Sequence, residues 1–252
     1  MVLSMKALVI KEFTVGEGDK YLTLFTDKYG RIEVFAKKAK RSKTSVLSGT
    51  ELFVYGNFIV EKIRDTYKLS NVEIIRSFYD LRKDIVTLSY ASFIIEFLNE
   101  VLKENSTNRN LLRLALYTLN ELPKKNLSEN LVRFVFETRA LRYLGYMPNV
   151  YGCVQCNKNI EQLDTNKHYA FSIEMGGLVC EQCIQQLNLE YVYRLKAGTV
   201  YTLRHALTAP FKQLYYFTAP DELINEFCKV SDRFLRFYID KDFKTLDFIR
   251  NL

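Results

Sequence analysis

The fold is decided by residues 7–38, which read ALVIKEFTVGEGDKYLTLFTDKYGRIEVFAKK. Three short apolar runs rich in β-branched and aromatic residues occur here, at 7–10, 21–25 and 32–35. Each run has the length and composition of a strand, and turn-forming residues separate it from the next. Gly30 closes the turn 27–30 and can adopt positive φ, while its neighbours alternate as in a hairpin. The stretch therefore predicts three strands.

Two more strand-like segments follow at 52–60 and 67–75, which brings the expected number of strands to five. A five-stranded barrel of the OB type closes such a short segment with few exposed strand edges. We therefore expect an N-terminal OB-fold barrel over residues 1–80.

After Asp80 the apolar period becomes helical. The pattern predicts a long helix over 81–103, a second over 111–122 that Pro123 stops, and a third that Ser128 caps and Gly145 ends. Two further helices are expected over 199–207 and 221–238. The fold class is therefore α+β: a barrel over 1–80, then a helical domain over 81–252 that carries a cysteine-bearing insertion at about 146–190.

Four of the five cysteines form two C-x-x-C pairs with 23 residues between them, namely Cys153, Cys156, Cys180 and Cys183. Two residues between thiolates let both sulfurs face one ion, and two such pairs complete a tetrahedron. Asn157 can adopt the left-handed conformation that such a knuckle needs. The spacing predicts one structural zinc ion per chain, because four thiolates leave no open position for a catalytic water.

Other interpretations of the cysteines remain open. The four thiols could be reduced structural cysteines without a metal, and His168, between the pairs, could replace one of them as a ligand. Cys228 lies apart from the pairs in a helical pattern, and we expect a buried, inert thiol there.

A basic run follows the third strand directly and places five cations within seven residues: Lys37, Lys38, Lys40, Arg41 and Lys43. No acid occurs between Val34 and Thr50, and the net charge of the chain is +7. A loop between barrel strands is well placed to bind nucleic-acid phosphates. The alternative is a solvated loop that is basic for solubility. Aromatic residues near the run that could stack on bases are Phe35, Phe53, Tyr55 and Phe58.

The sequence lacks the motifs that are typical of several classes of enzyme. The glycines at 16 and 18 do not have the spacing of an ATP-binding loop, and neither histidine lies in a hydrolase pattern. Acidic residues do not pair as in a two-metal nuclease. The first twenty residues lack the order of a signal peptide, and no apolar run is long enough to cross a membrane. We expect a cytoplasmic protein that is not an enzyme.

Three blocks of the sequence resemble the RecO family of bacterial recombination mediators. They are residues 7–43, residues 133–149 with LGYMPN at 144–149, and the cysteine segment 153–180 with GGLVC at 176–180. Lys38 departs from the family, which usually has glycine at this position. The resemblance covers essentially the whole chain.

The resemblance implies a mediator of DNA repair that binds single-stranded and double-stranded DNA and anneals complementary strands. With RecR it would load RecA on DNA coated with single-stranded DNA-binding protein (SSB), in the cytoplasm at the nucleoid. It also implies that the SSB tail docks on the helical domain, where Arg133, Arg139 and Arg142 share one predicted helix. For each arginine, an ion pair with neighbouring acids is an alternative.

Two other classes of function stay open. The chain could be a zinc-containing adaptor between proteins that contacts DNA only incidentally, or a metal-dependent enzyme acting on nucleic acid. Binding of partners without DNA affinity would favour the adaptor, and a product formed from labelled strands would favour the enzyme.

Overall fold

A computed structural model describes residues 1–39, 44–187 and 189–252 of the chain. Contacts between residues divide it into two compact units. Unit 1 comprises residues 1–123 together with 243–252, and unit 2 comprises residues 124–242. Each unit has its own core and is described separately.

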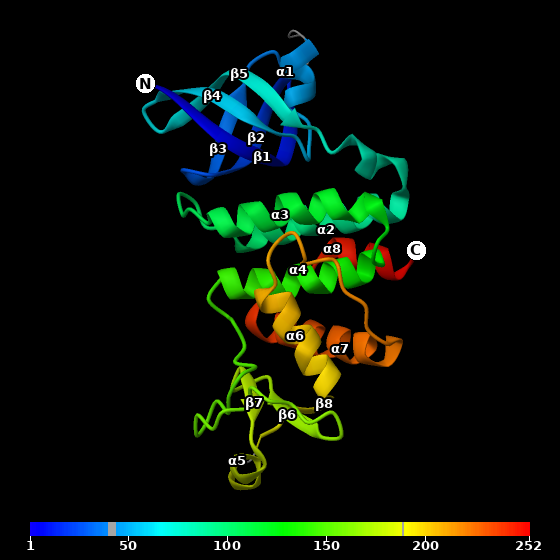
Figure 1. The fold of residues 1–252 in the computed structure, drawn as a ribbon. Coiled ribbons are helices and arrows are strands. Elements are labelled where there is room, and N and C mark those ends of the chain that lie inside the picture. The colour runs from blue at the N-terminus through cyan, green and yellow to red at the C-terminus, as the bar shows by residue number, and fades with distance from the viewer. Residues whose placement is uncertain (40–43, 188) are drawn as a thin grey trace. The chain divides into compact units, whose positions relative to one another are not determined.

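Unit 1 begins with a closed barrel of five strands in the order β1-β2-β3-β5-β4 (Figure 1). The strands are β1 (Val2–Val15), β2 (Asp19–Thr26), β3 (Gly30–Ala36), β4 (Tyr55–Ile63) and β5 (Thr66–Arg76). Antiparallel pairing of β1 with β4 and a short parallel pairing of β3 with β5 close the barrel. The predicted OB-type barrel of five strands is therefore confirmed.

The side chains that point inward from the five strands fill the barrel interior. Residues of all five strands, among them Ala7, Leu24, Val34, Phe58 and Val72, form one buried cluster. A β-bulge between Val9 and Lys11 shifts the register of β1 against β2. Because a one-residue shift exchanges the two faces of a strand, the odd-numbered residues of β1 point inward before the bulge and outward after it.

Gly30 begins β3 at the predicted turn and has a φ of +66°. A Cβ atom at this position would lie 2.4 Å from the carbonyl oxygen of Ser106, so the backbone conformation and the close approach both require glycine. A short helix, α1 (Thr44–Gly49), stands between β3 and β4 and contacts β5. The sequence had not indicated this helix.

Unit 1 also contains the helices α2 (Ile85–Val101), α3 (Arg109–Glu121) and α8 (Lys244–Arg250) and the 3-10 turn η2 (Tyr79–Lys83). The 3-10 turn η3 (Leu122–Lys124) spans the end of unit 1 and the start of unit 2 in the sequence. The side chains of Asp84 and Asn108 accept hydrogen bonds from backbone N–H groups at the starts of α2 and α3. Asn99 of α2 donates its amide to the carbonyl of Ile10, 2.8 Å away, and so joins the helix to the barrel at the bulge.

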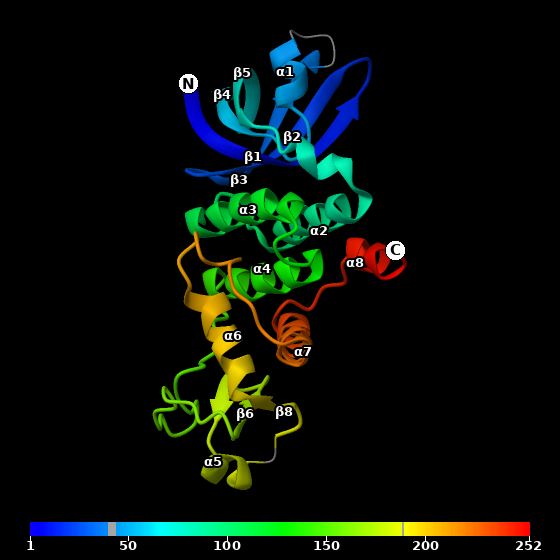
Figure 2. The ribbon, with the colours of Figure 1, turned by 45° about the vertical axis from the view of Figure 1, so that its right-hand side comes forward.

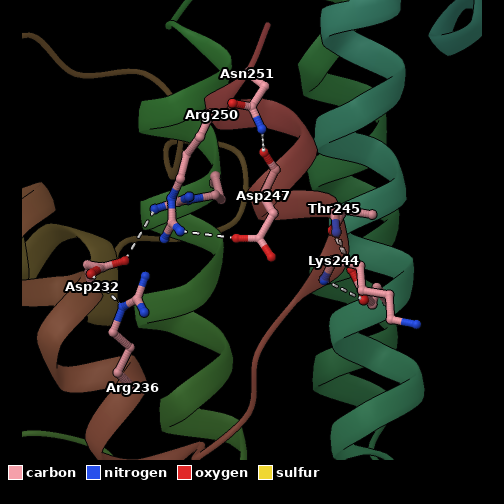
Figure 3. A network of polar contacts seen from close by, with 9 residues as sticks. Asp232, Arg236, Lys244, Thr245, Asp247, Arg250 and Asn251 are labelled. Carbon is pink, nitrogen blue, oxygen red and sulfur yellow. Dashed lines mark hydrogen bonds and ion pairs between the residues drawn. The ribbon is translucent and has the colours of Figure 1, made fainter.

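Glu96 of α2 receives the C-terminal segment. Its carboxylate accepts hydrogen bonds from the backbone N–H groups of Lys244 and Thr245, at 2.9 and 3.0 Å, and from the Thr245 hydroxyl. Figure 3 shows both donors at the start of α8. Because the carboxylate satisfies donors that a helix start leaves unpaired, residues 243–252 belong to unit 1 although they are distant in sequence.

Unit 2 contains the helices α4 (Glu129–Tyr143), α5 (Glu181–Gln186), α6 (Ala197–Thr208) and α7 (Asp221–Tyr238) and the strands β6 (His168–Ser172), β7 (Gly177–Val179) and β8 (Val192–Lys196). Helices α4, α6 and α7 pack on one another (Figure 2), and the strands form a sheet in the order β7-β6-β8 (Figure 1). Phe171 of β6 packs edge-on against Phe234 of α7, with ring centroids 5.8 Å apart.

The predicted stop and start signals of the third helix are confirmed. The Ser128 hydroxyl accepts a hydrogen bond from the N–H of Leu131, and Gly145 follows the helix with a φ of +93°. The small sheet, α5 and α8 were not predicted.

The expected division into domains 1–80 and 81–252 stays a prediction. The two compact units have other boundaries, because contacts group α2, α3 and α8 with the barrel. Among the described residues, no helix has the length and apolar character that crossing a membrane requires.

Candidate functional site

The first cysteine pair lies in a tight knuckle. The N–H of Cys153 donates to the carbonyl of Lys158 at 2.8 Å, and the N–H of Asn157 donates back to the carbonyl of Cys153 at 2.9 Å. Asn157 has a φ of +59°, which is the left-handed conformation that the sequence predicted. The turn thus places the side chains of Cys153 and Cys156 on the same side of the chain.

The second pair begins where β7 ends. Cys180 stands directly before α5, and Cys183 lies within this helix, one turn later. The N–H of Cys180 donates to the Sγ atom of Cys153 at 3.3 Å, so the two pairs are already in contact through the backbone. Residues 27 positions apart in the sequence are thereby joined at one centre.

The four sulfur atoms lie close enough together to share one ion. All four Sγ atoms lie within 4.8 Å of one another, and those of Cys156 and Cys180 are 3.7 Å apart. In a tetrahedron with metal–sulfur bonds of about 2.3 Å, neighbouring sulfurs are about 3.8 Å apart. The four cysteines could therefore hold one metal ion, and His168, exposed at the start of β6, is not among the grouped ligands.

The thiol pKa values reflect this crowding. Burial raises the pKa of Cys153, but backbone N–H groups, that of Cys180 foremost, lower it to about 6 overall. The pKa of Cys183 is raised to about 12 by the hydrogen bond with Cys180, by burial and by the other thiols. One centre thus combines a low-pKa thiol, that of Cys153, with one that resists a second negative charge, that of Cys183, and a bound dication removes this conflict.

Two residues outside the C-x-x-C pairs hold the knuckle in place. A Cβ atom on Gly177 would lie 2.4 Å from the carbonyl oxygen of Asn149, so only glycine permits this approach of β7. Arg204 of α6 is buried and donates to the carbonyls of Val150, Ile160 and Glu161, which flank the first pair. Sequence reasoning missed Arg204, because a single arginine in a helix gives no signal of distant carbonyl partners.

Cys228, the fifth cysteine, lies outside the grouped ligands, on α7. Burial raises the pKa of its thiol to about 12, so the thiol stays protonated at neutral pH. This pKa is consistent with the expected inert thiol, although Cys228 is only partly buried and not fully buried as expected.

The basic run begins on the barrel. Lys37 and Lys38 directly follow β3 and are exposed, whereas Lys40, Arg41 and Lys43 lie outside the described residues. The N–H of Lys38 donates to the carboxylate of Asp19 at 2.6 Å. Lys38 has a φ of +50°, a conformation that glycine adopts more readily. Glycine would therefore suit this position, as the resemblance to the family implied.

The four aromatic candidates divide by burial. Phe53 and Phe58 are 2% and 0% exposed and belong to the core, so neither ring can reach a base in this structure. Phe35 and Tyr55 are partly exposed. The ring of Phe35 contacts that of Tyr21, at a centroid distance of 5.1 Å. Sequence reasoning did not single out Tyr21, which is 46% exposed.

The three arginines of α4 make contacts within unit 2. Arg139 is buried and donates to the carbonyls of Ala206 and Ala209, and Arg142 donates to the carbonyl of Leu207. These carbonyls belong to the C-terminal end of α6, where a positive charge is stabilising. Arg133 is 8% exposed and lies 3.2 Å from the Glu137 carboxylate. Their role in binding a partner stays a prediction.

Glu137 is fully buried on α4. Burial raises its pKa to about 8, although the neighbouring Arg133 acts in the opposite direction. In the unfolded chain the carboxyl group titrates near the ordinary glutamate pKa of 4.5. Between these values the folded protein binds the proton more tightly, so protonation stabilises the folded state at low pH.

We therefore expect the free energy of unfolding to fall as pH rises from about 4.5 to 8, by at most about 1.4 kcal/mol per pH unit from this group. Glu137→Gln should remove this contribution. Urea unfolding at pH 5.5, 7 and 8.5 measures it, with Glu161→Gln, an exposed glutamate of the same unit, as control. Parallel curves for wild type and Glu137→Gln would show that Glu137 is ionised in the folded protein.

The fold and the site define a class of protein: an OB-type barrel joined to helices that carry a four-cysteine centre able to hold a metal ion. Two family models match the chain, Recombination protein O N terminal over residues 1–78 and Recombination protein O C terminal over residues 82–247. The chain belongs to the RecO family of DNA repair proteins.

Relatives named DNA repair protein RecO match along nearly their full length. That of Acetivibrio thermocellus is 32% identical over 250 residues, which cover 99% of this chain and 97% of the relative. That of Alkaliphilus metalliredigens is 28% identical over 255 residues and all of both chains. That of Caldanaerobacter subterraneus is 28% identical over 250 residues, or 99% and 98% of the two chains.

Proposed function

We propose that this protein binds single-stranded and double-stranded DNA through its barrel and the basic run, and anneals complementary strands without covalent chemistry. The observation that carries the proposal is the closed barrel whose strand β3 runs directly into exposed Lys37 and Lys38, the first two of five clustered cations. Membership of a DNA repair family supports DNA as the polyanion.

The physics of annealing requires little more than such a surface. Two DNA strands repel each other as polyanions, and lysines that neutralise phosphates release counterions and speed the encounter. No ATP is needed, provided that the protein releases the duplex once it has formed. An affinity that falls with salt suits this purpose, because phosphate contacts are strong for both strands and specific for neither.

The metal proposed for the four-cysteine centre is zinc, in a structural role. Four thiolates at tetrahedral spacing are a donor set that zinc prefers, and they leave no position for a reacting water. Zinc would join β7, α5 and the first knuckle into one stable element of unit 2.

The proposed partners are those of a recombination mediator: RecR, SSB and, indirectly, RecA. The acidic and apolar tail of SSB requires cations beside an apolar pocket. In unit 2, exposed Arg233 and Arg236 lie beside Tyr191 and Phe237 in a pocket of about 340 Å³. Arg133, Arg139 and Arg142 remain proposed contacts, of which Arg142, half-buried, is more accessible than the other two.

Annealing can be measured with two complementary oligonucleotides, one carrying a fluorophore and the other a quencher, without added nucleotide. We expect the full-length chain to raise the rate of quenching, and both strands to remain intact in magnesium or manganese. Pairing no faster than without protein, while partner proteins still bind, would favour an adaptor instead. A cleaved or modified strand would show an enzyme.

A further inference from the structure

Three aromatic rings stand in register on the outer face of the barrel. Phe13 of β1 pairs with Tyr21 of β2, and Tyr21 pairs with Phe35 of β3. Residues paired across strands project from the same face of a sheet. Phe13 is 62% exposed and Tyr21 46%, so this face is the outer one. Phe13, Tyr21 and Phe35 are called the aromatic row below.

The β-bulge creates this row. Before it, Ala7 and Val9 point into the barrel; after it, Glu12 pairs with buried Leu22 and forms an ion pair with buried Lys20. Phe13 is consequently turned to solvent. Without the bulge Phe13 would share the inward face of Val9, so a large ring is placed in water by a specific irregularity of the strand.

Cations border the aromatic row. Lys68 of β5 pairs with Phe35 and extends the row by one strand, and Lys11 and Lys37 stand two residues from Phe13 and Phe35 along their chains. All three lysines are exposed. The acids nearby include Glu33, exposed on β3, Glu61 of β4, which is exposed and pairs with Lys68, and Asp19, which accepts the hydrogen bond from Lys38. Rings flanked by lysines fit a ligand with flat apolar groups on an anionic backbone.

We propose that the aromatic row is a base-stacking surface for single-stranded DNA, which rests on the proposed DNA binding by the barrel and adds the residues that recognise unpaired bases. Neighbouring strands are about 4.8 Å apart, wider than the rise of about 3.4 Å between bases in duplex DNA. A strand lying across β1, β2 and β3 is therefore held extended, with its bases separated from one another.

This mode of binding leaves the pairing edges of the bases accessible. Stacking uses the flat face of a base and makes no hydrogen bond to its Watson–Crick edge. A complementary strand can then pair with a strand that is still bound, and the duplex that forms has no exposed base faces to hold. The aromatic row thus favours single strands over duplex and releases the product of annealing.

The first test compares a normal oligonucleotide with an abasic one of equal phosphate number. We expect wild type to bind the normal strand more tightly and Phe13→Ala/Tyr21→Ala to lose most of this preference, with at least about 5-fold lost for each ring removed. The slope of affinity against salt should not change, because the rings are neutral. Tyr21→Phe, which keeps the ring, should bind as wild type. A circular dichroism spectrum of Phe13→Ala/Tyr21→Ala equal to that of wild type excludes misfolding as the cause.

A second test uses fluorescence, since the chain contains no tryptophan. Single-stranded DNA should quench the emission of Phe13→Trp, whereas duplex should not. Tyr216→Trp, an exposed site of unit 2, should be unaffected and serves as control. The matched control for the alanine variant is Tyr79→Ala/Tyr216→Ala, which removes two exposed rings elsewhere.

The outcomes separate this inference from the proposed function. Wild type that fails to bind single strands overturns the proposed function itself. Salt-dependent binding of wild type together with unchanged binding by Phe13→Ala/Tyr21→Ala overturns only the aromatic row. Loss of a protein partner with unchanged DNA affinity overturns it too, because the row would then be a protein interface.

Discussion

Cys153→Ser is expected to remove the metal and to unfold the cysteine-bearing part of unit 2. The buried cluster around the site is small: Cys153, Val179 and Cys183 are its buried members. Structural zinc in small domains contributes about 10–16 kcal/mol, which equals or exceeds the net stability of about 5–15 kcal/mol of a typical domain. Apolar contacts alone therefore cannot replace the ion.

Elemental analysis and circular dichroism measure this effect. Wild type should contain one zinc per chain, and Cys153→Ser well under half of one, with a lower helix content and a lower melting temperature. Cys228→Ser is the matched control. Because the Cys228 thiol lies outside the centre, this variant should retain one zinc per chain. Full metal content in Cys153→Ser, or wild type equally stable after the metal is stripped, would contradict the structural role.

The affinity for single-stranded DNA is expected to fall strongly when the five cations of the basic run are replaced with alanine, namely Lys37, Lys38, Lys40, Arg41 and Lys43. Each phosphate neutralised on a single strand contributes about 0.7 to the slope of log affinity against log salt. Five contacts give a slope of about −3.5, so affinity of wild type should fall about 100-fold between 50 and 200 mM salt. The five-alanine variant should bind weakly at both concentrations.

The control for charge replaces five exposed lysines of unit 2 with alanine: Lys158, Lys167, Lys212, Lys229 and Lys241. This variant has the same net charge as the five-alanine variant of the barrel. If overall charge alone drove binding, the two variants would lose affinity equally. We expect the unit 2 variant to retain the affinity and the salt dependence of wild type.

The sequence allowed the barrel and the metal centre to be predicted because both depend on local patterns. Alternation and the turn at Gly30 indicated the strands, and the spacing of Cys153 to Cys183 indicated the tetrahedron that the sulfur distances fit. The cap at Ser128 likewise depends on a few neighbouring residues. In these cases the physical cause lies within a short stretch of chain.

Features that depend on distant partners could not be predicted. No residue near Lys244 indicates that its backbone N–H donates a hydrogen bond to the carboxylate of Glu96. Likewise, no pattern in α4 indicates that Arg139 donates to the carbonyls of α6. The exposure of Phe13 depends on a bulge, and alternation alone would have placed this ring with Val9. Strand register, and not composition, therefore decides which aromatic rings of the barrel can meet a base.

The most direct test of DNA binding by the barrel and its basic run is the affinity of the full-length chain for a labelled single strand, measured at several salt concentrations. We predict a slope of about −3.5 for wild type and for the unit 2 control, and a much shallower slope for the five-alanine variant of the barrel. A slope near zero for wild type, or the same slope with and without the five cations, would contradict the account.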